Sequence, residues 1–286
     1  MDFDPTPPQQ ELIDAAAAVA RESLAPRAAL YDRTGAYPLE SWHDLWRHGF
    51  LAAAVPVKYG GRGLDMPSYV MVLEQLAQGC VNTTMTLHMH SVVQMYIDTL
   101  ASPAQKARFY PEVVEHGKLY GSWGSEPDRR GGASVGGTVI APRNGGYVIE
   151  GDKHFCTMAG AAHRYMVHCA MRGIAGPQNL QLALVPHDHP GLTIKGEWDT
   201  LGMRATVSPS VRLSACDVPA EALLGLPGES LRSGVGWHSG WDTRPSTRAR
   251  PSRPWTSRST SARRTASSRT PPPAPTTRSS STAWPR

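Results

Sequence analysis

Long apolar runs and paired cysteines are both missing from this sequence of 286 residues. No stretch approaches the roughly 18 consecutive apolar residues of a membrane-spanning helix, and the first residues lack the pattern of a secretory signal. The four cysteines (Cys80, Cys156, Cys169 and Cys216) lie far apart and form no Cys-x-x-Cys pair. Such spacing is typical of a reduced interior and not of a disulfide framework. We therefore expect a cytoplasmic protein with no membrane contact.

The C-terminal stretch 244–286 lacks the residue types that build a core. It contains no Leu, Ile, Val, Met, Phe or Tyr, and it consists mainly of Ser, Thr, Arg, Pro and Ala. Such a segment cannot bury enough apolar surface to offset the entropy of ordering it, so we predict a disordered tail over residues 233–286. The composition changes abruptly near Gly236, and we interpret the residues that follow as coding sequence read out of frame.

The same stretch contains no acidic residue, and this absence explains the net charge of the chain. The formal charge is +5, but residues 244–286 hold ten Arg. The preceding 243 residues therefore hold 19 basic and 24 acidic side chains, a net charge of −5. Because the basic charge is confined to a tract rich in Pro and Ser, we do not expect a nucleic-acid-binding protein.

Residues 1–117 show the periodicity of amphipathic helices. Between residues 9 and 30, apolar side chains recur at helical spacing: Leu12, Ala16, Val19, Ala20 and Leu24. Asp65 and Ser102 precede Met-Pro and Pro-Ala, which is typical of the first turn of a helix. We predict an N-terminal all-α helical bundle over residues 1–117.

The period changes after Lys118. Short alternating segments bounded by Gly, Pro, Asn and Asp predict strands at 138–141, 147–155, 165–171, 180–185, 192–195 and 211–216. We predict an antiparallel β-barrel or sandwich domain over residues 118–232, so the fold class is α+β with two domains and a tail.

The stretch from Gly121 to Thr157 carries the clearest functional signal. Ser125 follows an apolar-aromatic run, and Thr157 ends an alternating run after Phe155. Small hydroxyl residues at two strand ends, beside a flat apolar side chain, suit a planar ligand with a polar edge.

Three blocks in this order resemble the flavin-dependent acyl-CoA dehydrogenases, over about residues 5–232. That family carries Thr-Glu-Pro, a Gly-Tyr after about twenty residues, Gly-x-Lys-x-Trp-Ile-Thr, Leu-Gly-Met-Arg, and an earlier Val-Pro-x-x-Tyr-Gly-Gly-x-Gly. In this chain the central block consists of Ser125-Glu126-Pro127, Gly146-Tyr147 and Gly151 to Thr157. The second block is Leu201-Gly202-Met203-Arg204, and the upstream block runs from Val55 to Gly63.

The resemblance implies FAD as cofactor. By position, Ser125 would meet the pyrimidine edge of the flavin, Thr157 would lie near N5, and Phe155 would pack on the ring. Ser122 and Gly124 would offer backbone contacts, and the implied cofactor-binding set is completed by Trp123 and Cys156.

Gly131 departs from the family pattern, and Glu126 adds little to the functional signal. Gly131 stands where the family has a serine that meets the pantetheine arm, which makes it a weak candidate for substrate binding. Glu126 is the only acid in Ser125-Glu126-Pro127, and its place before a proline suggests a structural turn. Because the family's proton-abstracting carboxylate comes from a C-terminal helical domain, we expect no catalytic residue in this chain.

Other catalytic motifs are weak or absent. The glycines at 131–137 lack the lysine of a P-loop, and no nucleophile elbow or His-Glu-x-x-His occurs. The pairs His88/His90 and His187/His189 have no third ligand in view, so surface or turn histidines are favoured over a metal site.

The resemblance implies α,β-dehydrogenation of an acyl-CoA thioester, electron transfer to an electron-transfer flavoprotein, and homo-oligomers. We expect this chain to be truncated and impaired. One alternative is a flavin-dependent monooxygenase of the same fold, which would need no catalytic carboxylate. Another is a non-catalytic product of a frameshifted gene.

Overall fold

The computed structural model describes residues 4–127 and 137–236. The predictions for Gly131 and for residues 237–286 of the tail lie outside this range. The first tail residues, 233–236, lie within it, and Val235 there is buried. Within it, no helix is long and apolar enough to cross a membrane.

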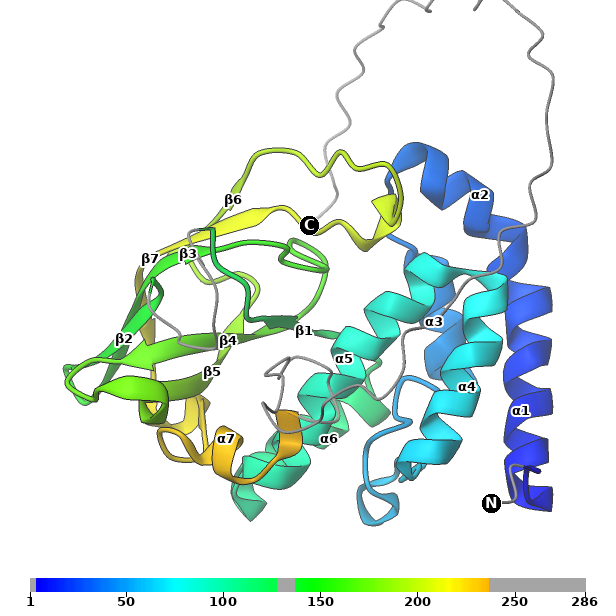
Figure 1. Ribbon diagram of the computed structural model, residues 1–286, viewed down its shortest axis with the longest axis horizontal. Coiled ribbons are helices and arrows are strands. Elements are labelled where there is room, and N and C mark those ends of the chain that lie inside the picture. Colours follow the sequence, from blue (N-terminus) through cyan, green and yellow to red (C-terminus); the bar gives the residue numbers. More distant parts are fainter. Residues whose placement is uncertain (1–3, 128–136, 237–286) are drawn as a thin grey trace, which may run out of the picture. The chain divides into compact units, whose positions relative to one another are not determined.

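Helices occupy the first part of the chain (Figure 1). They are α1 (Pro7–Val19), a π-helical turn (Ala20–Leu24), α2 (Ala25–Thr34), α3 (Leu39–Arg47), α4 (Met66–Gly79), α5 (Val81–Leu100) and α6 (Pro103–Val114). Two of the expected caps are present: Asp65 accepts a hydrogen bond from the Ser68 amide, and Ser102 forms a capping box with Gln105. The single helix expected over residues 9–30 is interrupted by the π-helical turn. There α4 comes so close that a Cβ on Gly79 would meet the Ala20 carbonyl oxygen at 2.4 Å.

A sheet with short flanking elements follows the helices. Its strands are β1 (Tyr120–Trp123), β2 (Val139–Arg143), β3 (Gly146–Lys153), β4 (Arg164–Met171), β5 (Leu180–Pro186), β6 (Leu192–Lys195), β7 (Ser210–Val218) and β8 (Leu223–Leu224), and α7 (Glu229–Arg232) comes last. The order along the sheet is β6-β7-β3-β2-β4-β5-β8, and β1 pairs with β4.

The order of helices followed by a β domain is confirmed, but the expectation of a wholly antiparallel sheet is wrong. β4 pairs in parallel with both β1 and β2, so the sheet is mixed. Parallel partners need long crossovers, and local alternation along the sequence carries no information about them. The six strands whose bounds were predicted are all present. β1 agrees with the strand end expected before Ser125, although its bounds were not predicted, and β8 was not predicted.

Gly151 in β3 has a conformation that other residues avoid. Its φ is +145°, and it lies where the β3–β7 register shifts. A Cβ at this position would come within 2.6 Å of the Thr138 backbone. The bulge therefore explains the glycine of the Gly-x-Lys motif, because only glycine fits this backbone beside its neighbouring strand.

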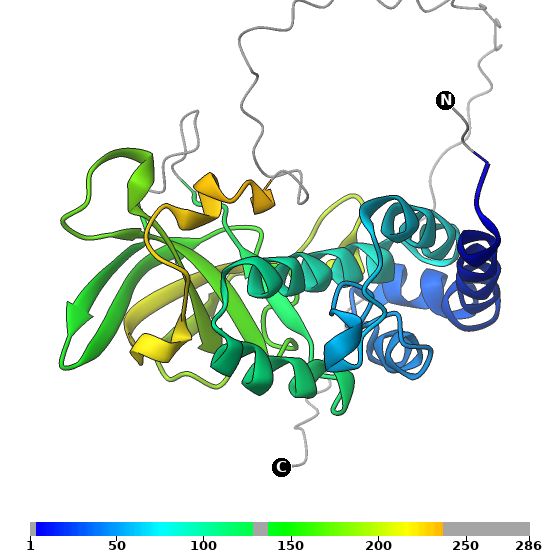
Figure 2. The same cartoon turned by 90° about the horizontal axis from the view of Figure 1, so that it is seen from below.

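Buried and partly buried polar contacts join α5 and α6 to the sheet, and α5 runs beside β1 (Figure 2). His90 on α5 is fully buried; its Nδ1 accepts from the Tyr120 amide at 2.9 Å, and its Nε2 contacts the Leu51 carbonyl oxygen at 3.0 Å. Glu112 on α6 accepts two hydrogen bonds from Arg164 on β4, at 2.8 and 2.6 Å. His90 is thus a structural residue of the core, and the expectation of a surface or turn histidine is wrong for it.

The burial of His90 makes stability dependent on pH. Burial lowers the pKa of His90 to about 4, whereas an unfolded chain titrates near 6.5. Between these two values the unfolded chain binds a proton that the folded chain excludes, so stability should fall as pH drops from 6.5 to 4. Moving from pH 7 to pH 5 should cost about 2 kcal/mol from this group.

Urea unfolding of the parent chain and of His90→Gln at the two pH values measures this contribution. We expect the difference in stability between pH 7 and pH 5 to shrink in His90→Gln and to stay unchanged in the control His48→Gln, where the histidine is exposed. The half-buried His163 should leave a residual slope, because partial burial lowers its pKa as well. Equal slopes in all three proteins would refute the assignment.

Candidate flavin site

The two segments predicted to form one site are hydrogen-bonded to each other. The first follows β1 and the second follows β3. The amide of His154 donates to the Ser125 carbonyl oxygen at 2.9 Å, and the indole Nε1 of Trp123 donates to the Thr157 carbonyl oxygen at 3.1 Å. These bonds bring the regions of Ser125 and Thr157 together, although about thirty residues separate them in the chain.

The seven candidate residues differ in their exposure to solvent. Phe155 is 54% exposed, Ser125 is half-buried, and the other five are buried: Ser122, Trp123, Gly124, Cys156 and Thr157. Trp123 stacks on Tyr165, with ring centroids 3.7 Å apart and planes at 17°. Because the ring of Trp123 lies in the core, a ligand would meet this residue through its backbone. Burial also raises the pKa of Cys156 to about 12, which keeps its thiol neutral and unreactive.

Phe155 has a strained backbone, and its ring packs against two other aromatic side chains. Its φ is +53°, a left-handed conformation that is rare for a residue with a Cβ. His154 packs edge-on at 4.5 Å between centroids, and Trp198 packs edge-on at 6.0 Å. Strain of this kind concentrates at functional sites. Trp198 was not predicted, because nothing in its local sequence links it to Phe155.

Glu126 is held in a buried ion pair. Its carboxylate accepts from Lys153 Nζ at 2.8 Å and from the amides of Gly137 and Thr138 at 2.8 and 3.1 Å. The side chain of Lys153 is fully buried, and that of Glu126 is 7% exposed. Burial alone would raise the pKa of Glu126, but the Lys153 charge and these hydrogen bonds lower it below its ordinary value. A carboxylate with its acceptor sites already filled is a structural group, in keeping with the turn expected from the sequence.

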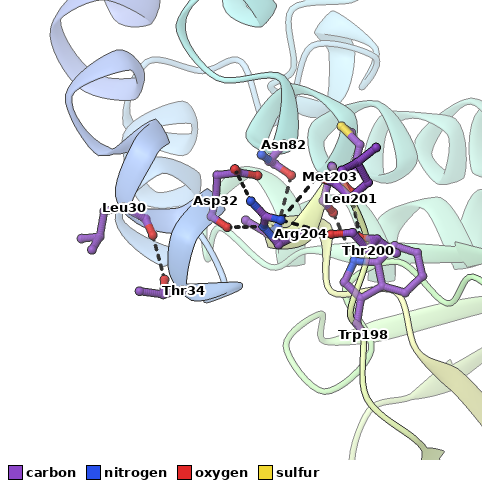
Figure 3. A network of polar contacts seen from close by, with 11 residues as sticks. Leu30, Asp32, Thr34, Asn82, Trp198, Thr200, Leu201, Met203 and Arg204 are labelled. Atoms are coloured by element: carbon purple, nitrogen blue, oxygen red, sulfur yellow. Dashed lines mark hydrogen bonds and ion pairs between the residues drawn. The ribbon is translucent and has the colours of Figure 1, made fainter. Parts of the chain in front are cut away.

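Arg204 joins the loop before β7 to the helices (Figure 3). Its guanidinium donates to the backbone oxygen of Asp32 at 2.7 Å and to the Asp32 carboxylate at 3.0 Å. It also donates to the carbonyl oxygens of Thr200 and Leu201, both at 3.3 Å. Nearby, Asn82 on α5 accepts from the Ala205 amide at 3.2 Å. The Leu-Gly-Met-Arg motif therefore has a structural explanation as a clamp between α2 and this loop.

Arg204→Lys should destabilise the chain by about 1–3 kcal/mol, because an ammonium cannot reproduce the planar fork of donors. The matched control is Arg212→Lys, which disturbs an ion pair with Asp152 that is 48% and 40% exposed. We expect that control to cost below about 1 kcal/mol. Urea unfolding measures both, and equal costs would contradict the proposed clamp.

Comparison with known proteins agrees with this arrangement. Residues 6–116 match the family model of the acyl-CoA dehydrogenase N-terminal domain, and residues 122–216 match that of the middle domain. A probable acyl-CoA dehydrogenase of Bacillus subtilis, YngJ, is 29% identical over 242 residues, covering 81% of this chain and 62% of the relative.

Two solved structures are similar in fold. Butyryl-CoA dehydrogenase from Megasphaera elsdenii has a TM-score of 0.75 and 28% identity, with 82% of this chain and 62% of that chain covered. The dibenzothiophene monooxygenase TdsC from a Paenibacillus species has a TM-score of 0.66 and 27% identity, with 78% and 55% covered. The chain thus spans less than two thirds of the length of these proteins. Its two matched domains, in the order helices then sheet, show that the chain belongs to the acyl-CoA dehydrogenase family.

Proposed function

We propose that this chain carries the FAD-binding part of an acyl-CoA dehydrogenase. The observation that supports this most strongly is the pairing of the Ser125 and Thr157 segments. On these two hydrogen-bonded segments lie a hydroxyl, backbone groups and the exposed ring of Phe155. A flavin needs such a set, with donors for its polar edge and a flat apolar surface for its ring. When bound, the flavin would accept a hydride from the β-carbon of an acyl-CoA thioester.

The residues of this chain would bind and orient both molecules. Ser125 would meet the pyrimidine edge, Thr157 would donate near N5, and Phe155 would exclude water from one face of the ring. The proton from the α-carbon needs a base, and Glu126 is unsuited because its carboxylate is committed to Lys153 and two amides. The base would therefore come from the part of the family fold that this chain does not span. An electron-transfer flavoprotein as acceptor, a homo-oligomer and a cytoplasmic location complete the proposal.

A flavin monooxygenase is the second candidate, favoured by the similarity to TdsC, which is solved with bound FMN. Reoxidation distinguishes the two. We expect flavin reduced on this protein to pass its electrons faster to a flavoprotein acceptor than to oxygen. Faster reaction with oxygen would favour the monooxygenase, and a failure to bind any flavin would favour a non-catalytic product of a disrupted gene.

A further inference from the structure

Three buried hydroxyl groups form a short chain that ends at Thr157. The oxygen of Thr206 lies 2.9 Å from that of Ser208, and Ser208 Oγ donates to Thr157 Oγ1 at 3.0 Å. All three residues are nearly inaccessible, with exposed fractions of 3%, 4% and 8%. Each hydroxyl has a single hydrogen to donate, so the direction of each bond in such a chain is constrained.

The geometry directs the hydrogen of Ser208 to Thr157, at 3.0 Å, and the other acceptor of Ser208, the Thr206 carbonyl oxygen, is farther away at 3.5 Å. With that hydrogen used, the contact between Thr206 and Ser208 takes the hydrogen of Thr206. Two acceptors compete for that hydrogen, since the Met203 carbonyl oxygen also lies 2.9 Å from Thr206 Oγ1. Within the described part of the chain, the Thr157 hydroxyl accepts from Ser208 and donates to no other residue. Its hydrogen therefore remains available to a bound molecule.

The backbone keeps these hydroxyls at fixed separations. The amide of Met158 donates to the Thr206 carbonyl oxygen, and the amide of Cys156 donates to the Pro209 carbonyl oxygen, both at 3.0 Å. On each side of Thr206, Met203 and Val207 hold left-handed conformations, with φ of +59° and +39°. A strained loop bonded at two points to the Thr157 segment has little freedom to change the geometry.

We infer that Ser208, supported by Thr206, is a positioning residue that turns the Thr157 hydroxyl into a hydrogen-bond donor toward an acceptor nitrogen of the flavin ring. This inference rests on the proposed function. A hydroxyl that already accepts from Ser208 has its own hydrogen directed away from the chain, and the two bonds polarise each other. Without Ser208, Thr157 could rotate and point an oxygen lone pair at the same nitrogen, which would repel it.

A double-mutant cycle in FAD affinity tests the inference. FAD is titrated against the parent chain, Ser208→Ala, Thr157→Val and the double variant, and flavin fluorescence is recorded. A single hydrogen bond is worth about 3- to 10-fold in affinity, so each single variant should bind that much more weakly. The double variant should bind no more weakly than Thr157→Val, because Ser208 acts only through Thr157.

Two further readouts separate positioning from packing. Ser208→Thr and Ser208→Val add nearly the same volume, but only the former keeps the hydroxyl, so only Ser208→Thr should retain the affinity and the visible flavin spectrum of the parent. In the protein without flavin, Ser208→Ala should shift the NMR signal of the Thr157 methyl group. That measurement also applies to a variant that has lost FAD.

The outcomes distinguish the inference from the proposed function. If the parent chain binds no FAD at any concentration, the proposed function is wrong and the inference falls with it. If the parent binds FAD but the losses in Ser208→Ala and Thr157→Val simply add, only the inference is overturned. Equal affinities of Ser208→Thr and Ser208→Val would overturn it as well, since volume and not the hydroxyl would then matter.

Discussion

The purified 286-residue chain should oxidise acyl-CoA at least about a hundredfold more slowly than butyryl-CoA dehydrogenase from Megasphaera elsdenii assayed under the same conditions. Removal of a positioned general base costs about 10²–10⁴ in rate. Glu126 is neutralised by Lys153, and no acidic residue occurs after Asp242. We also expect FAD to bind reversibly and to be lost on gel filtration, because Phe155 is 54% exposed in the described part of the chain, so a flavin packed on its ring would remain partly in water.

The assay uses an artificial electron acceptor, short-chain acyl-CoA and added FAD, and bound flavin is measured by absorbance. The Megasphaera enzyme is the matched control, since it shares the fold and is longer than the matched region. Stoichiometric FAD after gel filtration, with turnover near about one per second, would lie in the ordinary enzyme range and contradict this expectation.

Glu126→Gln should destabilise the chain by about 3–5 kcal/mol, more than Arg204→Lys. It would leave the ammonium of Lys153, which is fully buried, without its counter-charge. Desolvated charges that lose their partner destabilise by this amount, which is a large share of the roughly 5–15 kcal/mol that stabilises a typical domain. Because Glu126 directly follows Ser125, loosening of this turn should also weaken FAD binding. Urea unfolding measures the loss of stability, and a fluorescence titration measures the loss of affinity.

Two variants make the result specific. Glu126→Gln combined with Lys153→Met removes both charges and should recover most of the loss, since replacing a whole buried pair is far less costly than breaking it. Glu22→Gln breaks the ion pair with Arg21, in which both side chains are more than two thirds exposed, and should cost below about 1 kcal/mol. A cost for Glu126→Gln as small as that of Glu22→Gln would show that the buried pair is not needed.

Elements with a strong local period could be predicted from the sequence. The alternation in β3 and β7, and the Ser102-Pro103 start of α6, were sufficient to place those elements. The bounds of β1 could not be found this way, because all four of its residues are buried and the strand shows no alternation of buried and exposed side chains. Its parallel pairing with β4 depends on residues more than forty positions away, which local pattern does not report.

The residues of the candidate site also fall into those that could be predicted from the sequence and those that could not. Ser125, Phe155 and Thr157 could be found because they occupy recognisable positions in motifs. The partners that hold them could not: Trp198, Thr206 and Ser208 lie in a loop about forty to fifty residues further on, with no spacing that marks them. Lys153 was part of a recognised motif, but its pairing with Glu126 follows from the meeting of two strand ends.

An NMR titration of the isotope-labelled chain with FAD tests the central claim most directly, that the segments around Ser125 and Thr157 together bind the flavin. We predict saturable shifts at the amides of Ser125 and Thr157 and at the indole N–H of Trp123, which donates to the Thr157 carbonyl oxygen. Leu223 and Leu226, which line a cavity of about 610 Å³ beside α6, should not shift. Shifts confined to that cavity, or no shifts at saturating FAD, would contradict the claim.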